Sequence, residues 1–189
     1  MKKTILAGLS GGILLLAWFS VVDGLIGFRR NVAMRELADE RLVYAFLSEH
    51  IRTPGRYVLN PQVLPEHRFP GEEPIYSVQY SGLGHADAGQ EMLAGLVIMI
   101  AAPLAGAILL ANASGRVMSR YLTRFLFFSG IGFVMALFGI IERFGLASYP
   151  LADALALAGH DLGAWVVVGL WVAWMIRPVK QKEVDGPVS

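Results

Sequence analysis

The 189-residue sequence contains no cysteine. This absence excludes disulfide bonds, thiolate-bound zinc, cysteine-bound iron–sulfur clusters and c-type haem attachment. Charged residues are also scarce, since they make up 16% of the chain, whereas soluble domains carry about a quarter. The formal net charge of +1 is too small to indicate a basic surface for nucleic acid. The composition therefore excludes thiol chemistry and disfavours a nucleic-acid partner.

Apolar residues are abundant, at 55% of the chain with a mean hydropathy of +0.54. They are gathered into blocks, a distribution typical of membrane proteins. The clearest block covers residues 92–112 and has no charged residue. A helix that crosses a bilayer needs about 20 apolar residues, so this block is long enough to span. Pro103 within it predicts a bend in the helix.

Three further blocks resemble this one in length and composition: residues 5–26, 125–141 and 159–176. We therefore predict an all-α membrane protein built as a four-transmembrane-helix bundle. A short interfacial helix over 151–157 is expected before the last span. Gly8 and Gly12 are four residues apart, a spacing that favours close approach of a neighbouring helix. No A-x-A cleavage motif follows the first block, which favours an uncleaved helix over a signal peptide.

Residues 27–90 form a polar insert between the first two spans. Apolar residues at three- and four-residue steps predict a helix over 32–52. Two short strands are predicted after it, over 56–59 and 75–80. This small α+β unit has too few residues for an independent hydrophobic core. We therefore expect it to rest on the membrane, on the other helices or on a partner.

Basic residues predict the orientation of the spans. With the N-terminus in the cytoplasm, the cytoplasmic segments carry Lys2, Lys3, Arg116, Arg120, Arg124, Arg177, Lys180 and Lys182. Arg29 and Arg30 oppose this arrangement, but they begin a long loop, where the positive-inside rule is weak. We expect both termini inside, the insert outside, spans two to four within 91–177, and a cytoplasmic tail over 178–189.

This topology brings polar residues from all four spans to one depth near the outer face. They are Asp23, His85, Asp87, Glu91, Glu142, Arg143, His160 and Asp161. The simplest interpretation is a solvated rim in which Glu142 or Asp161 pairs with Arg143. The alternative is a metal or proton site, since imidazole and carboxylate suit zinc or iron. Its ligands would be His85, Asp87, His160 and Asp161.

Motifs for other chemistry are absent from the sequence: no Gly-x-Ser-x-Gly, Walker, dinucleotide-binding or His-Glu-x-x-His pattern occurs. A buried b-type haem would need histidines within the spans, and only His160 is close to one. Trp165, Trp171 and Trp174 could line a lipid or quinone groove, although such residues are more often interfacial anchors. We therefore predict no catalytic residue and no cofactor.

Several features occur in order: Lys2-Lys3, Gly11-Gly12 and Trp18 in the first span, an outer helix, the strand and turn over 57–61, and three more spans. This order resembles a group of small bacterial inner-membrane proteins without assigned function. The resemblance implies a multi-pass protein of that membrane and transfers no catalytic residue. The layout also resembles that of claudins, but the paired cysteines and Trp motif of their first outer loop are absent.

The function expected from these observations is that of a non-enzymatic interaction or accessory subunit acting through the outer insert. Its partners would be the lipid bilayer and either another membrane protein or a second copy of the chain. Two alternatives remain open. One is a small membrane enzyme or metal-binding protein that uses the outer His/Asp residues. The other is a transporter of a small solute or lipid.

Overall fold

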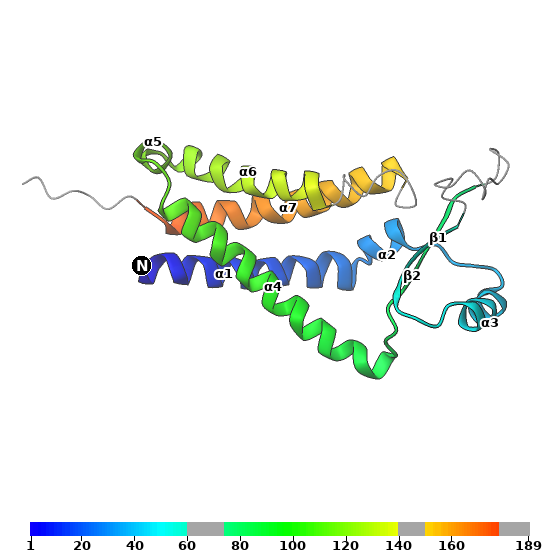
Figure 1. The fold of residues 1–189 in the computed structure, drawn as a ribbon. Helices are drawn as coiled ribbons and strands as arrows, with labels where there is room; N and C mark the ends of the chain where they lie inside the picture. Colours follow the sequence, from blue (N-terminus) through cyan, green and yellow to red (C-terminus); the bar gives the residue numbers. More distant parts are fainter. Residues whose placement is uncertain (60–73, 140–149, 178–189) are drawn as a thin grey trace, which may run out of the picture.

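The computed structural model describes residues 1–59, 74–139 and 150–177, without the side chains of residues 85–88, 90 and 91. This part of the chain is mainly helical and includes one small sheet (Figure 1). Four helices of the described chain are long and apolar enough to cross a membrane, the number that the sequence predicts. They are α1 with its continuation η1 (Lys2–Phe19, Ser20–Leu25), α4 (His85–Ala111), α6 (Tyr121–Gly139) and α7 (Leu151–Met175).

The remaining elements are short: α2 (Phe28–Ala33), α3 (Glu40–His50), β1 (Gly55–Leu59), β2 (Tyr76–Tyr80) and α5 (Gly115–Ser119). The prediction of one helix over 32–52 is wrong, because the structure has α2 and α3 there. Met34 adopts extended backbone (φ −118°, ψ 135°), which ends α2. Arg35 beyond it pairs with Asp153 of α7 at 3.5 Å. Apolar periodicity continued through this break and therefore did not reveal it.

The predicted division between an interfacial helix at 151–157 and a span at 159–176 is also wrong. The structure has a single helix, α7, which runs through Gly159 without interruption. A glycine inside a helix costs only about 1 kcal/mol, which the packing of α7 can offset. His160 and Asp161 therefore lie inside a long helix and not at its beginning.

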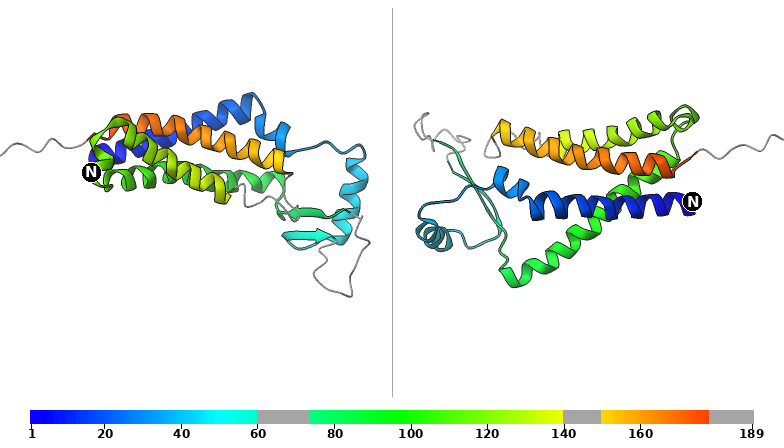
Figure 2. Two further views of the ribbon diagram at one scale, coloured as in Figure 1. Left: turned by 90° about the horizontal axis from the view of Figure 1, so that it is seen from above. Right: turned by 180° about the vertical axis from the view of Figure 1, so that it is seen from behind.

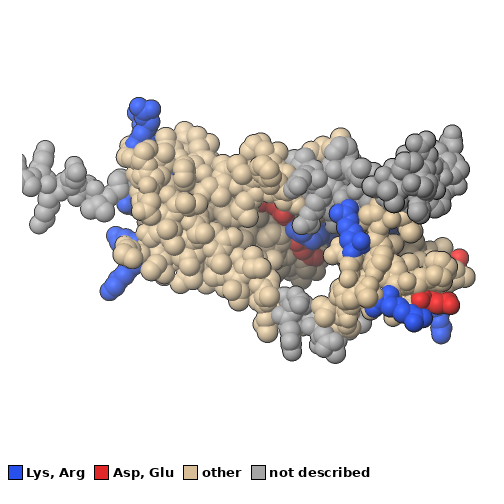
Figure 3. Space-filling model, in the orientation of Figure 1, with Lys and Arg blue, Asp and Glu red and all other residues tan. Residues whose placement is uncertain are grey.

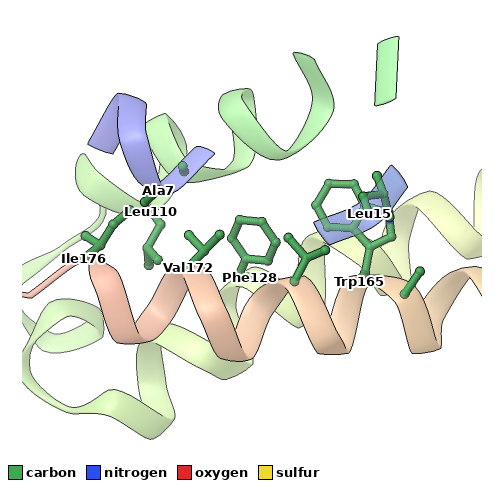
Figure 4. Packing of buried hydrophobic residues seen from close by; sticks show 10 residues of the cluster. Ala7, Leu15, Leu110, Phe128, Trp165, Val172 and Ile176 are labelled. Atoms are coloured by element: carbon green, nitrogen blue, oxygen red, sulfur yellow. The ribbon is translucent and has the colours of Figure 1, made fainter. Parts of the chain in front are cut away.

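The long helices pack against one another at the end of the molecule that carries the N-terminus. α1 packs against α4 and α7, and α6 packs against α7. Figure 4 shows the core between them, where Phe128 of α6 and Trp165 of α7 lie among aliphatic side chains. The N-terminal half of α4 diverges from the other helices (Figures 1 and 2). Met92 and Val97 on this half are accordingly exposed.

Glycines set the contact between α1 and α4. A methyl group added at Gly8 would lie 2.6 Å from Leu104 Cα, and one at Gly12 would lie 2.8 Å from Ile100 Cα. Both distances are too short for a side chain, so the two backbones meet only because these residues are glycine. The predicted close approach at Gly8 and Gly12 is thus confirmed, with α4 as the neighbour.

The described connections between the long helices, and the N-terminus, lie at the two ends of the molecule. The N-terminus, α5 and the C-terminal end of α7 lie at one end, and α2, α3 and the hairpin lie at the other (Figures 1 and 2). On the face drawn in Figure 3, Lys and Arg side chains lie at the end that carries the N-terminus, an uncharged surface follows, and charged side chains of both signs appear from the middle of the molecule to the other end. This distribution is what four membrane-spanning helices require.

We expect Gly12→Ala to lower the stability of the protein, because the new methyl group collides with the backbone of α4. Overpacking of this kind costs about 1–3 kcal/mol. Gly95→Ala is the matched control on α4, since nothing lies within 4 Å of the methyl position there. Thermal unfolding in detergent measures both variants. Equal melting temperatures for Gly12→Ala and the unmodified chain would contradict the close contact.

Candidate functional site

The chain reverses direction where the first span ends, and this turn builds a polar site. α1 loosens into a π-helix over Ser20–Leu25, a form that is rare and often found at functional sites. Gly27 follows with a φ of 71°, a left-handed conformation that favours glycine. The turn brings Arg29 of α2 back toward Asp23. Its backbone N–H donates to Asp23 Oδ1 at 3.3 Å.

His160 of α7 lies beside this turn, with its side chain only 2% exposed. Trp18 Nε1 donates a hydrogen bond to His160 Nε2 at 3.2 Å, which requires a lone pair on that nitrogen. His160 Nδ1 lies 3.0 Å from Asp161 Oδ1 and so acts as the donor. Each ring nitrogen of the imidazole therefore has a partner among the described residues. Asp23 Oδ1 lies 3.4 Å from Nε2.

Aromatic rings enclose the same imidazole. Phe28 stacks on His160 with 5.0 Å between ring centroids and 13° between planes. Phe19 and Trp18 approach at 5.3 Å and 6.0 Å with tilted planes. These contacts exclude water from the ring, so its hydrogen bonds must come from the protein. An unpaired buried polar group would cost about 1–3 kcal/mol.

Arg29 joins the two carboxylates of the site. Its Nε lies 3.3 Å from Asp23 Oδ2, and one terminal nitrogen lies 2.9 Å from Asp161 Oδ1. Charges removed from water are stable only when they are paired. Two carboxylates thus share one guanidinium in this site. We refer to Trp18, Asp23, Arg29, His160 and Asp161 as the His160 cluster.

Arg124 of α6 is also buried among the described residues, at the opposite end of the helices from His160. Its Nε donates to the carbonyl of Ala173 at 3.1 Å, and Nη1 donates to the carbonyl of Met118 at 2.7 Å. Ala173 lies in the last turn of α7, where carbonyls lack partners within the helix. A cation also interacts favourably with this end of the helix dipole. Arg124 therefore has a structural role.

The structure places some of the residues predicted to form the outer polar rim together, and it does not describe the side chains of the others. The structure brings Asp23, His160 and Asp161 together. His85, Asp87 and Glu91 belong to the divergent N-terminal part of α4, and their side chains are not described. Glu142 and Arg143 lie outside the described residues, so the predicted pairing with Arg143 was not tested.

A metal site on His85, Asp87, His160 and Asp161 stays a prediction. Within residues 1–59, 74–139 and 150–177, no group of three or more His, Cys, Asp or Glu could hold a metal ion. Around His160, Trp18 donates to Nε2, and Arg29 pairs with Asp23 Oδ2 and Asp161 Oδ1, atoms that would otherwise be available to a cation. The described side chains of the His160 cluster thus satisfy one another without a metal.

The sequence analysis treated Arg29 only as a basic residue that opposes the predicted orientation. It did not identify Arg29 as the counterion of Asp23 and Asp161. It also did not connect Trp18 with His160, which is 142 residues away. One signal was available, namely Asp23 and Arg29 on either side of Gly27, a glycine suited to a reversal. The pairing across to α7 had no local signal.

Comparison with known proteins adds no relative. No family model matches the chain, and neither a curated protein nor a solved structure is significantly similar to it. The functional argument therefore rests on the geometry of this chain.

We expect a double-mutant cycle on Arg29→Gln and Asp161→Asn to give a coupling of about 1 kcal/mol, because the pair is partly shielded from water. The Arg35–Asp153 pair is the control, since Arg35 is 72% exposed and the contact is 3.5 Å long. Its coupling should be smaller. Chemical denaturation in detergent measures both cycles. A coupling at Arg29–Asp161 no larger than the control would show that the cluster does not hold α2 against α7.

Proposed function

We propose that the chain is a non-enzymatic accessory subunit of the bacterial inner membrane that binds another membrane protein through its outer insert. In this proposal α1, α4, α6 and α7 form a four-helix bundle with both termini in the cytoplasm. The insert between α1 and α4 lies on the other side of the membrane. The His160 cluster holds the beginning of the insert against α7.

The observation that carries the proposal is the position of the insert. α3 and the β1–β2 hairpin project beyond the end of the long helices, as Figures 1 and 2 show. No residue of α3 is buried. Large apolar side chains are exposed on it and on the strands: Leu42, Tyr44, Phe46, Leu59, Tyr76 and Tyr80. Exposed apolar groups gathered on one small unit are typical of an interaction surface.

The hairpin offers a specific way to bind. β1 pairs antiparallel with β2, with Tyr57 opposite Val78, and each strand has one neighbour in this two-stranded sheet of the described chain. Within the described chain, the edge of β2 away from β1 carries backbone groups that a strand from a partner could pair with. Beside β2, a cavity of about 370 Å³ lined by Leu47, Ile51 and Tyr80 could take an apolar side chain. A partner β-strand with an apolar residue suits this surface.

The alternatives have less support. A transporter would need an open path between the helices, and the contacts at Gly8 and Gly12 bring α1 and α4 too close for one. A metal-dependent enzyme would need ligands with open positions, whereas the side chains around His160 are paired with one another. Interaction through the insert is the function that accounts for the exposed surface.

The partner prediction is tested with a photoreactive phenylalanine analogue at Tyr76, an exposed aromatic residue of β2. We expect a discrete protein adduct after irradiation of intact cells, because the hairpin lies against its partner. An adduct of twice the chain mass would identify a second copy as that partner. Tyr121, at the other end of the molecule, is the matched control and should give no such adduct. Adducts with lipid alone at Tyr76, Tyr80 and Phe46 would refute the proposal.

The orientation can be tested because the chain has no cysteine. We expect Ser77→Cys on β2 to react with a membrane-impermeant maleimide in cells with a permeabilised outer membrane. Ser119→Cys on α5 should react only after the inner membrane is opened. The measurement is a mass shift on a gel. The reverse order of labelling would place the insert in the cytoplasm and exclude the proposed topology.

A further inference from the structure

A cavity of about 280 Å³ lies between α6 and α7, next to the His160 cluster. Its α6 wall consists of Gly132, Met135, Ala136 and Gly139, three of which are small. Nothing lies within 4 Å of the position that a methyl group would take on Gly139. The space beside Gly139 is therefore open because this residue presents a hydrogen atom where most helix residues would present a side chain.

The end of the cavity nearest α2 is polar and charged. Arg29 and Asp161, which pair at 2.9 Å, both line it, and their side chains are 43% and 26% exposed. A guanidinium has five N–H donors, and two of those on Arg29 point to Asp23 and Asp161. Asp161 uses only Oδ1 in its contacts with the other described residues. A ligand at this end of the cavity can therefore contact the positively charged donor Arg29 and the negatively charged acceptor Asp161 at the same time.

The deeper part of the cavity is apolar. Trp165 lies one helical turn after Asp161 on α7, and Met135 lies on α6. Both α6 and α7 are long and apolar enough to cross a membrane, so this side of the cavity lies among hydrocarbon chains. The cavity accordingly has a charged end and an apolar end, like a lipid in the surrounding bilayer.

We propose that this cavity binds a zwitterionic aminophospholipid, with its ammonium group on Asp161, its phosphate on Arg29 and the start of an acyl chain against Trp165. The charge of the site selects this class. Asp23 and Asp161 share the single guanidinium of Arg29, and this excess of carboxylates disfavours a lipid whose head group is purely anionic. An ammonium group also donates hydrogen bonds to a carboxylate, which a quaternary choline head group does not. Charge-assisted bonds to both groups are the strong kind.

This lipid site goes beyond the proposed accessory role, because it does not involve α3 or the hairpin. A bound lipid would bridge α2, α6 and α7 and so add to the contacts that hold the first turn of the insert in place. The two proposals can fail separately. If the accessory role is correct and the lipid site is not, the protein shows no selective lipid binding but Tyr76 still gives its protein adduct.

The test uses purified full-length protein, stripped of lipid in detergent and examined by native mass spectrometry. Dioleoyl phosphatidylethanolamine, phosphatidylcholine and phosphatidylglycerol are added separately at equal concentration. We expect phosphatidylethanolamine to be retained roughly tenfold more than phosphatidylcholine, the effect of one charge-assisted hydrogen bond. Equal retention of these two lipids, or stronger retention of phosphatidylglycerol, would overturn the proposal.

Two glycine variants locate the site. Gly139→Leu fills the cavity without meeting a neighbouring atom at its first carbon, so the protein should fold and lose the selective retention of phosphatidylethanolamine. Gly130→Leu is the matched control on α6, since its methyl position is also open and it does not line the cavity. It should keep the selectivity. Undiminished selectivity in Gly139→Leu would place the lipid elsewhere and refute the assignment.

Discussion

Polar side chains buried along α7 must find their partners within the protein, because lipid supplies no hydrogen bonds. The side chain of His160 finds its partners in Trp18 and Asp161. The same requirement applies to backbone groups, and the carbonyl of Ala173 accepts a hydrogen bond from Arg124. These contacts tie α7 to α1 near one end and to α6 near the other. The apolar side chains between them supply area, and the polar contacts specify which helix faces meet.

The reversal after α1 follows from the same constraint. Arg29 can reach both Asp23 and Asp161 only if the chain turns back directly after the π-helix, and Gly27 permits that turn. α2 is thereby held against α7, as the Arg35–Asp153 contact also shows. The insert begins from a fixed point on the helices, although α3 and the hairpin project away from them. The proposed interaction with a partner rests on this arrangement, in which α3 and the hairpin are exposed and α2 is held against α7.

Glycine has two opposite roles in the long helices. At Gly12 it lets the backbones of α1 and α4 touch, so no space remains between them. At Gly139 no neighbour fills the space, and a cavity results beside the charged cluster. The difference lies in the partner: Ile100 of α4 closes over Gly12, whereas Trp165 of α7 packs against Gly132 and leaves the region of Gly139 open.

The sequence by itself determined the four apolar helices and the two short strands, because length, hydropathy and alternation are local properties. It also grouped Asp23, His160 and Asp161 at one depth, although it placed His160 and Asp161 at the beginning of a span and not inside a long helix. Only the tertiary structure decided that α7 continues through Gly159, that α2 and α3 are separate, and that Trp18 and Arg29 complete the cluster. The reason is physical: these features depend on contacts between residues far apart in the chain, and no periodic pattern records which distant side chain satisfies a buried polar atom.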